Sequence, residues 1–149
     1  MTGDLTHVDE QGQVRMVNVG DKPLSRRRAS AQATVRMAPE TARRLEELPK
    51  GDALAAARLA GIMAAKRTSE LIPLCHPLPL SGIELSFDVG EDAVQVVAVV
   101  ETVAQTGVEM EALVAASVAA LTIYDMAKGI DQGMVVEEVR LLEKTKTSA

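Results

Sequence analysis

Two apolar runs decide the fold of this chain, GIELSFDVG at 82–90 and AVQVVAVVETVAQ at 93–105. Both are apolar runs of strand length, and together they are typical of two neighbouring β-strands. The segment between them, Gly90-Glu91-Asp92, is short enough to connect antiparallel neighbours. The sequence therefore predicts a β-hairpin.

The segment after the hairpin predicts a long helix followed by a last strand. Thr106-Gly107 opens VEMEALVAASVAALTIYDMAKG at 108–129, and Gly129 is a typical helix stop. Apolar residues and alanine extend around the whole helix, so we expect it to be buried on most sides, between the sheet and another layer or subunit. MVVEEVRLLEK at 134–144 predicts a strand before a polar tail.

The segment before the hairpin predicts one strand, two helices and an extended loop. ASAQATVRM at 29–37 alternates like a half-buried strand, and ETARRLEEL at 40–48 suits a short exposed helix after Pro39. Asp52 is placed to cap a second helix over 53–71, and IPLCHPLPL at 72–80 carries three prolines that exclude helix. The second helix has a stripe of small apolar residues suited to close packing, comprising Leu54, Ala57, Gly61, Ala64 and Ala65.

This order of elements is a βαββαβ plan with an extra helix in the first crossover. It predicts a ferredoxin-like α+β fold, with an antiparallel sheet packed by helices. We expect residues 1–24 to form a loosely held N-terminal arm, with room for a short strand at 14–19, and residues 25–149 to form a single domain.

Composition narrows the class of protein. At 149 residues, with 47% hydrophobic and 25% charged residues, the chain suits one soluble globular domain. A net charge of −5 and 1% aromatic residues argue against nucleic-acid binding. We expect no apolar run to reach the ~20 residues of a membrane span. One cysteine and two histidines exclude an internal disulfide and a four-ligand zinc site. We expect a cytoplasmic protein whose flat, aromatic-poor faces pack on other subunits.

Acidic residues at both ends of the long helix are candidates for chemistry. Glu109 and Glu111 fall in its first turn, where the helix dipole stabilises acids. Asp125 falls in the last turn, where the helix dipole is unfavourable for an acid, and Lys128 follows three residues later on the same face. Asp125 and Lys128 could form a surface ion pair, or they could act together in acid/base chemistry and phosphate binding. Glu109 and Asp125 lie about 24 Å apart at ~1.5 Å per residue, so a ligand that used both ends would need two subunits.

Other candidates lie in the proline-rich loop and among the basic residues. His76 and Cys75 are adjacent in this loop, where a structural histidine and a packed thiol are the ordinary interpretations. The basic residues usually lie on solvated faces, but several of them at the ends of elements could converge on an anion such as a triphosphate. They are Arg26, Arg27, Arg28, Lys50, Lys66, Arg67, Lys144 and Lys146.

Two long segments carry a resemblance to a known family. KRTSELIPLCHPLPLSGIEL at 66–85 and TGVEMEALVAASVAALTIYDMAKGID at 106–131 resemble the MoaC family, the cyclic pyranopterin monophosphate synthase accessory proteins of molybdenum cofactor biosynthesis. LTHVDEQGQVRMVNVGDK near the start, SRRRASAQATVRM and VRLLEK extend the likeness over almost the whole chain.

The resemblance implies a ferredoxin-like subunit, a homohexamer built as a trimer of dimers, and active sites at dimer interfaces. It also implies a lyase reaction. The cyclised product of a radical partner enzyme, 3′,8-cyclo-7,8-dihydro-GTP, would be rearranged to cyclic pyranopterin monophosphate with release of pyrophosphate. No redox cofactor or protein-bound metal is implied, although Mg²⁺ could accompany the substrate triphosphate.

The same resemblance assigns roles to individual residues. It implies that Lys50 and Lys128 are the principal acid/base catalysts and that Asp125 tunes them or relays protons. It implies that Arg27, His76 and Lys144 bind the phosphates of the substrate. Glu109 and Glu111 would bind the base or orient side chains of a partner subunit. Cys75 would lie in the substrate site beside His76. Relatives often carry a glycine-rich segment after the last strand, where this chain reads TKTSA, so Lys146 is left without a role.

Two other classes of function compete with this interpretation. Ferredoxin-like oligomers often bind small ligands at their interfaces, so a non-catalytic nucleotide-sensing domain is the first alternative. A cysteine hydrolase that uses Cys75 and His76 ranks far lower, because adjacent residues in an extended loop rarely face each other for proton transfer.

Overall fold

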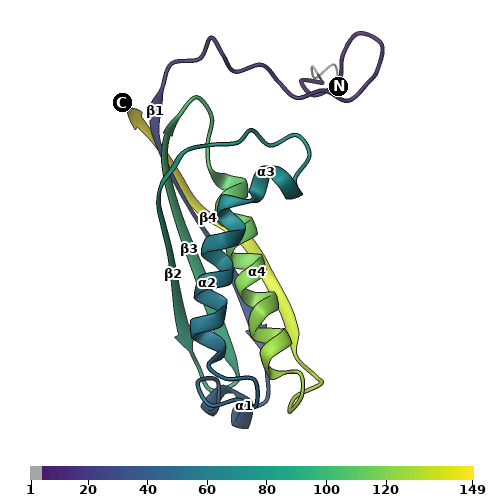
Figure 1. The fold of residues 1–149 in the computed structure, drawn as a ribbon, viewed down its shortest axis with the longest axis vertical. Coiled ribbons are helices and arrows are strands. Elements are labelled where there is room, and N and C mark those ends of the chain that lie inside the picture. Colours follow the sequence, from purple (N-terminus) through teal and green to yellow (C-terminus); the bar gives the residue numbers. More distant parts are fainter. Residues whose placement is uncertain (1–4) are drawn as a thin grey trace.

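The computed structural model describes residues 5–149, in which four strands form one antiparallel sheet. The sheet order is β2-β3-β1-β4, and the long helices α2 and α4 lie side by side along it (Figure 1). This is the predicted ferredoxin-like α+β plan. Its elements in chain order are β1 (Ser25–Arg36), α1 (Pro39–Arg43), α2 (Ala53–Lys66), α3 (Thr68–Leu71), β2 (Leu80–Val89), β3 (Ala93–Ala104), α4 (Glu109–Ala127) and β4 (Val135–Ser148).

The predicted hairpin of β2 and β3 forms. Val89 pairs with Val94, and the N–H of Gly90 donates to the carbonyl of Ala93 at 2.8 Å, which closes the turn. Every second residue of β3 is buried, beginning with Val94. The helices pack against the buried face of this strand.

The small-residue stripe of α2 lets it pack closely against α4. A Cβ at Gly61 would lie 3.0 Å from the Leu85 side chain and 3.1 Å from the carbonyl oxygen of Ala115 on α4, so only glycine fits without a shift. The predicted cap also forms, since Asp52 Oδ1 accepts from the N–H groups of Leu54 and Ala55. Because of the close approach at Gly61, α2 and α4 pack together as one layer.

Both predicted helices of the first crossover are shorter in the structure. The first covers Pro39–Arg43 rather than 40–48, and the following turn buries Leu45 and Leu48 instead of exposing them. The second ends at Lys66 rather than at residue 71, because the chain tightens there and α3 follows as a separate turn. In both places tertiary burial outweighs the helical pattern of the sequence.

The strands next to the arm and the tail differ from their predicted bounds. β1 begins at Ser25 rather than at residue 29, and β4 continues to Ser148 rather than ending at residue 144. The two additions pair with each other, Arg27 opposite Lys146. Residues 5–24 contain no strand at 14–19 and form only an isolated bridge between Val8 and Val14, while residues 1–4 of the predicted arm lie outside the described residues.

Helix α4 is the core helix of the subunit. It packs against α2, β1, β3 and β4, and one side of it is fully buried. As predicted, most of its residues are buried or half-buried between the sheet and another layer, and on its outer side Leu121 is 57% exposed in the single chain. The prediction that no apolar run could span a membrane needs correction, since α4 is long and apolar enough by length and composition, although its place is that of a core helix.

Candidate functional site

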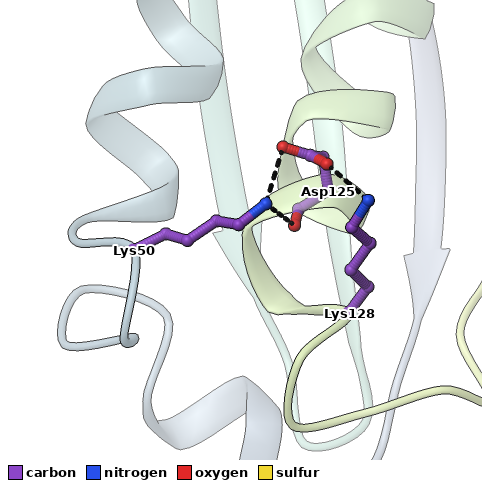
Figure 2. A network of polar contacts seen from close by, with 3 residues as sticks. All are labelled: Lys50, Asp125 and Lys128. Carbon is purple, nitrogen blue, oxygen red and sulfur yellow. Dashed lines mark hydrogen bonds and ion pairs between the residues drawn. The ribbon is translucent and has the colours of Figure 1, made fainter.

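Three charged side chains meet at the C-terminal end of α4 (Figure 2). Lys50 Nζ lies 3.2 Å from Asp125 Oδ2, and Lys128 Nζ lies 3.0 Å from Asp125 Oδ1. Lys50 also donates to the backbone carbonyl of Asp125 at 3.2 Å. The predicted Asp125–Lys128 pair is therefore confirmed, and the structure adds Lys50 to it.

Local backbone geometry explains how Lys50 reaches this cluster. Leu48 and Gly51 exchange two backbone hydrogen bonds that close a tight turn between α1 and α2. Gly51 has a φ of 114°, a conformation that favours glycine, and Lys50 lies just before it. The turn directs the lysine side chain across the gap to the end of α4 (Figure 2).

The two ammonium groups control the charge of Asp125. Hydrogen bonding and attraction from Lys128, followed by those from Lys50, lower the pKa of this carboxyl below its ordinary value. All three side chains are about half exposed, so a ligand can reach the amines without unfolding any element. Two amines around one carboxylate supply both proton-transfer groups and positive charge for an anionic substrate.

A second group of predicted residues lies at the opposite end of α4, around a cleft of about 350 Å³. The loop 72–79 contributes Cys75 and His76, and the start of α4 contributes Glu109. His76 Nε2 is hydrogen-bonded to the carbonyl of Val17, so the N-terminal arm closes one side of the cleft. The carboxylate of Glu109 folds back against Gly107, so a side chain at residue 107 would have to displace it.

Beside this cleft, Glu111 and Cys75 form a buried pair. Glu111 is 3% exposed, and its Oε2 lies 4.0 Å from Cys75 Sγ. Burial raises the pKa of Glu111, and Glu109 raises it further, whereas the backbone N–H of Glu111 acts in the opposite direction. Burial and the two carboxylates also raise the pKa of the Cys75 thiol, which disfavours the reactive thiolate that a cysteine hydrolase needs.

A cationic hollow of about 320 Å³ adjoins the same end of α4. It is lined by Arg27 of β1 and by Lys144 and Lys146 of β4, together with Glu109. Arg27 pairs with Lys146 and Ala29 with Lys144, and paired residues of an antiparallel sheet present their side chains on one face. Sequence analysis left Lys146 without a role because TKTSA stands where relatives often carry a glycine-rich segment, and it ended the predicted strand at residue 144. The alternating TKTS at 145–148 was the available signal.

The structure thus gathers the predicted residues into two groups rather than one. Lys50, Asp125 and Lys128 meet at the C-terminal end of α4, whereas Arg27, Cys75, His76, Glu109, Glu111 and Lys144 lie around its N-terminal end. Glu109 and Asp125 are separated by sixteen positions of continuous helix, or about 24 Å along the axis. One small ligand therefore does not contact both groups of a single chain.

Comparison with known proteins gives two matches. A model of the MoaC family matches residues 16–147. A protein of Herpetosiphon aurantiacus named cyclic pyranopterin monophosphate synthase is 57% identical over 145 residues, which cover 95% of this chain and 88% of that protein.

Proposed function

This chain belongs to the MoaC family, and from that premise we propose that it is a cyclic pyranopterin monophosphate synthase of molybdenum cofactor biosynthesis. It is a lyase that converts 3′,8-cyclo-7,8-dihydro-GTP to cyclic pyranopterin monophosphate and releases pyrophosphate. The structural observation that supports this proposal is the cluster of Lys50 and Lys128 around Asp125, because the reaction requires groups that donate and accept protons.

In this proposal the lysine cluster carries the proton transfers. Opening the reduced purine and closing the new ring require protons to be removed and delivered at nitrogen and carbon. Lys50 and Lys128 perform these transfers, and Asp125 holds both amines in place through its two carboxylate oxygens. Because substrate can displace either half-exposed ion pair, an amine becomes free to act when the site is filled.

The cationic hollow would serve the phosphates. Formation of the cyclic phosphate requires a sugar hydroxyl to attack the α-phosphorus while pyrophosphate leaves, so negative charge develops on the phosphate oxygens. Arg27, Lys144 and Lys146 offset that charge, and His76 at the neighbouring cleft adds a further contact. Glu109 and Glu111 lie nearer to the base or to partner side chains.

A complete site then requires two subunits. The two groups lie at opposite ends of α4, so the lysine cluster of one subunit meets the cationic hollow of another in a homohexamer arranged as a trimer of dimers. Exposed apolar residues on α2 and α4, Leu59, Met63 and Leu121, are consistent with subunit packing. We further propose that the enzyme is cytoplasmic and uses no redox cofactor, with Mg²⁺ entering, where it is needed, on the substrate triphosphate.

The test is an assay of the purified protein with the cyclised dihydro-GTP. We expect stoichiometric pyrophosphate release and a product with the mass of cyclic pyranopterin monophosphate. Lys128→Ala should lower the rate at which both signals appear by about 10²–10⁴-fold, while Arg44→Ala, which removes an exposed charge, should leave this rate unchanged. Tight binding of the substrate without turnover would instead support a nucleotide-sensing domain.

A further inference from the structure

Asp131 lies in the turn that follows α4, three residues after Lys128. One of its carboxylate oxygens, Oδ2, accepts the backbone N–H of Ala38 at 2.8 Å and the hydroxyl of Thr41 at 2.9 Å. The other oxygen, Oδ1, accepts the N–H of Gly133 at 3.1 Å. Asp131 therefore joins the end of α4 to the start of α1, across 93 and 90 positions of the sequence.

The three donors favour the ionised form of Asp131. The N–H of Ala38 does most to lower the pKa of this carboxyl, and the N–H of Gly133 and the hydroxyl of Thr41 act in the same direction against slight burial. Hydrogen bonds to an ionised acceptor are stronger than those between neutral groups. Thr41 is 2% exposed, so its hydroxyl is shielded from competing water. The link between the two segments is therefore made by a charged acceptor and a buried donor.

The two segments joined by Asp131 carry the two lysines of the cluster. Lys128 is the C-cap of α4, and its ion pair with Asp125 lies within one helical turn, so this pair is local to the helix. Lys50 reaches the same carboxylate from the turn between α1 and α2 (Figure 2). That second pair spans 75 positions and depends on how the turn lies against the end of α4.

The turn that carries Lys50 is held on both of its sides. After the turn, α2 packs closely on α4 at Gly61. Before the turn, α1 has only five residues, and Asp131 fixes its first residues to the end of α4. The N–H of Ala53 donates to the carbonyl of Leu45 at 2.8 Å, which connects the two sides. Without the carboxylate of Asp131, the α1 side of the turn loses these hydrogen bonds to the end of α4.

We propose that Asp131 is a positioning residue for the lysine cluster, which holds Lys50 within ion-pair distance of Asp125 by joining the start of α1 to the end of α4. Asp131 acts through Lys50 and not on the substrate. Such a residue matters because a misplacement of about 1 Å can cost a reaction about 10²-fold. The inference rests on the proposed function only in taking Lys50 as an acid/base group, and the geometry of the cluster is measurable without substrate.

The titration of Asp125 reports the position of Lys50. Carboxyl signals of the assembled, ¹³C-aspartate-labelled protein would be followed by NMR against pH, with the Asp125 signal assigned by its loss in Asp125→Asn. Lys50→Ala defines the upward shift of the Asp125 pKa that follows loss of one ammonium group. We expect Asp131→Ala to produce most of that shift. Asp88→Asn, which removes an exposed carboxylate from β2, should leave the Asp125 pKa unchanged.

The direction of this shift separates the proposal from a simple charge effect. Removing the negative charge of Asp131 would by itself lower the pKa of Asp125, because a neighbouring carboxylate disfavours ionisation. Withdrawal of the Lys50 ammonium group raises the same pKa. An upward shift in Asp131→Ala therefore reports movement of Lys50.

A matched pair of variants at Thr41 tests the link with little change in the core. Thr41→Val removes the hydroxyl donor and keeps the size of the side chain, whereas Thr41→Ser keeps the hydroxyl. We expect Thr41→Val to raise the Asp125 pKa by less than Asp131→Ala does, and Thr41→Ser to match the wild type. In the Asp131→Ala background, Thr41→Val should add no further shift, because its partner is already absent.

Activity gives a second readout that loss of stability alone would not reproduce. Rates with the cyclised dihydro-GTP would be measured at temperatures at which each variant is fully folded. Asp131→Ala should lower kcat by about 10–100-fold, since Lys50 is then misplaced. Affinity for GTP, used as an unreactive triphosphate that binds at the other end of α4, should change by less than about twofold. Thr41→Ser should have a higher kcat than Thr41→Val.

The outcomes separate this proposal from the proposed function. An Asp125 pKa that is unchanged or lowered in folded, assembled Asp131→Ala would overturn the positioning role. If that variant does not fold, the Thr41 pair decides, and a Thr41→Val protein with the wild-type Asp125 pKa would overturn the role. Absence of turnover in the wild type, with the expected shifts of the Asp125 pKa, would refute the proposed function and leave the positioning of Lys50 by Asp131 supported.

Discussion

The two ends of α4 carry carboxyl groups in opposite states. At the C-terminal end Asp125 is exposed, lies between two ammonium groups and has a lowered pKa, whereas at the N-terminal end Glu111 is buried beside a thiol and has a raised pKa. The helix dipole alone favours the reverse, since it stabilises acids at the N-terminus and destabilises them at the C-terminus. Ion pairing at one end and burial at the other therefore outweigh the dipole in this protein.

The largest effect that tests this comparison is expected at the lysine cluster. Replacing Lys50 or Lys128 by alanine should lower turnover by about 10²–10⁴-fold, the usual contribution of a positioned acid or base, with a smaller loss of substrate affinity. Single-turnover rates and a separate substrate titration would divide the two effects, after each variant has been found to assemble like the wild type. Near-normal rates at saturating substrate in both variants would remove the lysines as catalysts.

At the N-terminal end of α4, we expect substitutions to weaken substrate binding at least as much as they lower turnover. Arg27→Ala and His76→Ala each remove a proposed phosphate contact and should weaken affinity for an unreactive triphosphate by about 10–100-fold, since a charge-assisted hydrogen bond contributes ~1.5–3 kcal/mol. Arg36→Ala, at the far end of the same strand as Arg27 and paired with Glu137, is the matched control and should bind normally. If both test variants bound the triphosphate as well as this control, the proposed phosphate contacts would be rejected.

Protein stability should respond to pH in opposite directions at the two carboxyls. Asp125, with its lowered pKa, stabilises the fold above its ordinary pKa, and this contribution is lost as the pH falls through the lowered value. Glu111, with its raised pKa, contributes most below its ordinary pKa, and that contribution is lost as the pH rises through the raised value.

Thermal unfolding across pH would compare the two carboxyls directly. Asp125→Asn should flatten the fall in stability at acid pH, and Glu111→Gln should flatten the fall toward alkaline pH. The Asp125 effect should be the smaller, because exposed ion pairs are screened by solvent. Variants with the same pH dependence as the wild type would contradict the assigned environments.

The smallest effect on activity is expected from removal of the thiol. Cys75→Ala leaves the carboxyl of Glu111 in place and should lower turnover by less than about tenfold, because the raised pKa of Cys75 keeps it as a packing group. Rates and circular dichroism of the purified variant would be compared with those of the wild type. A folded variant with less than about a thousandth of the wild-type rate would restore the covalent interpretation.

The sequence predicted the parts of the fold that depend on local patterns. The short turn of the β2–β3 hairpin, the Asp52 cap and the Asp125–Lys128 spacing are all set by residues a few positions apart, and each is present in the structure. The extensions of β1 and β4 were missed because they stabilise each other across more than a hundred residues. The alternation of TKTS at 145–148 is a local signal for a strand, but no local pattern marks its pairing with β1, so the place of Lys146 opposite Arg27 appeared only in three dimensions.

The candidate site was predictable to a similar extent. Residue types at the two helix ends and their separation followed from helical geometry, but the approach of Lys50 to Asp125 depends on a turn whose packing no spacing rule describes. The buried state of Glu111 was equally hidden, because a glutamate in a first helical turn ordinarily lies in solvent. Burial of a charged residue is a property of the assembled fold.

Because α4 is an unbroken helix of 19 residues between the two groups, its length sets their separation and its helical repeat sets their relative orientation about the helix axis. Inserting or deleting a single residue within it would change the separation of the two ends by only ~1.5 Å but would rotate one end relative to the other by about 100°. Related chains that preserve this arrangement should therefore tolerate changes of length in the arm or at the hairpin turn, while the count of residues from Glu109 to Asp125 stays fixed.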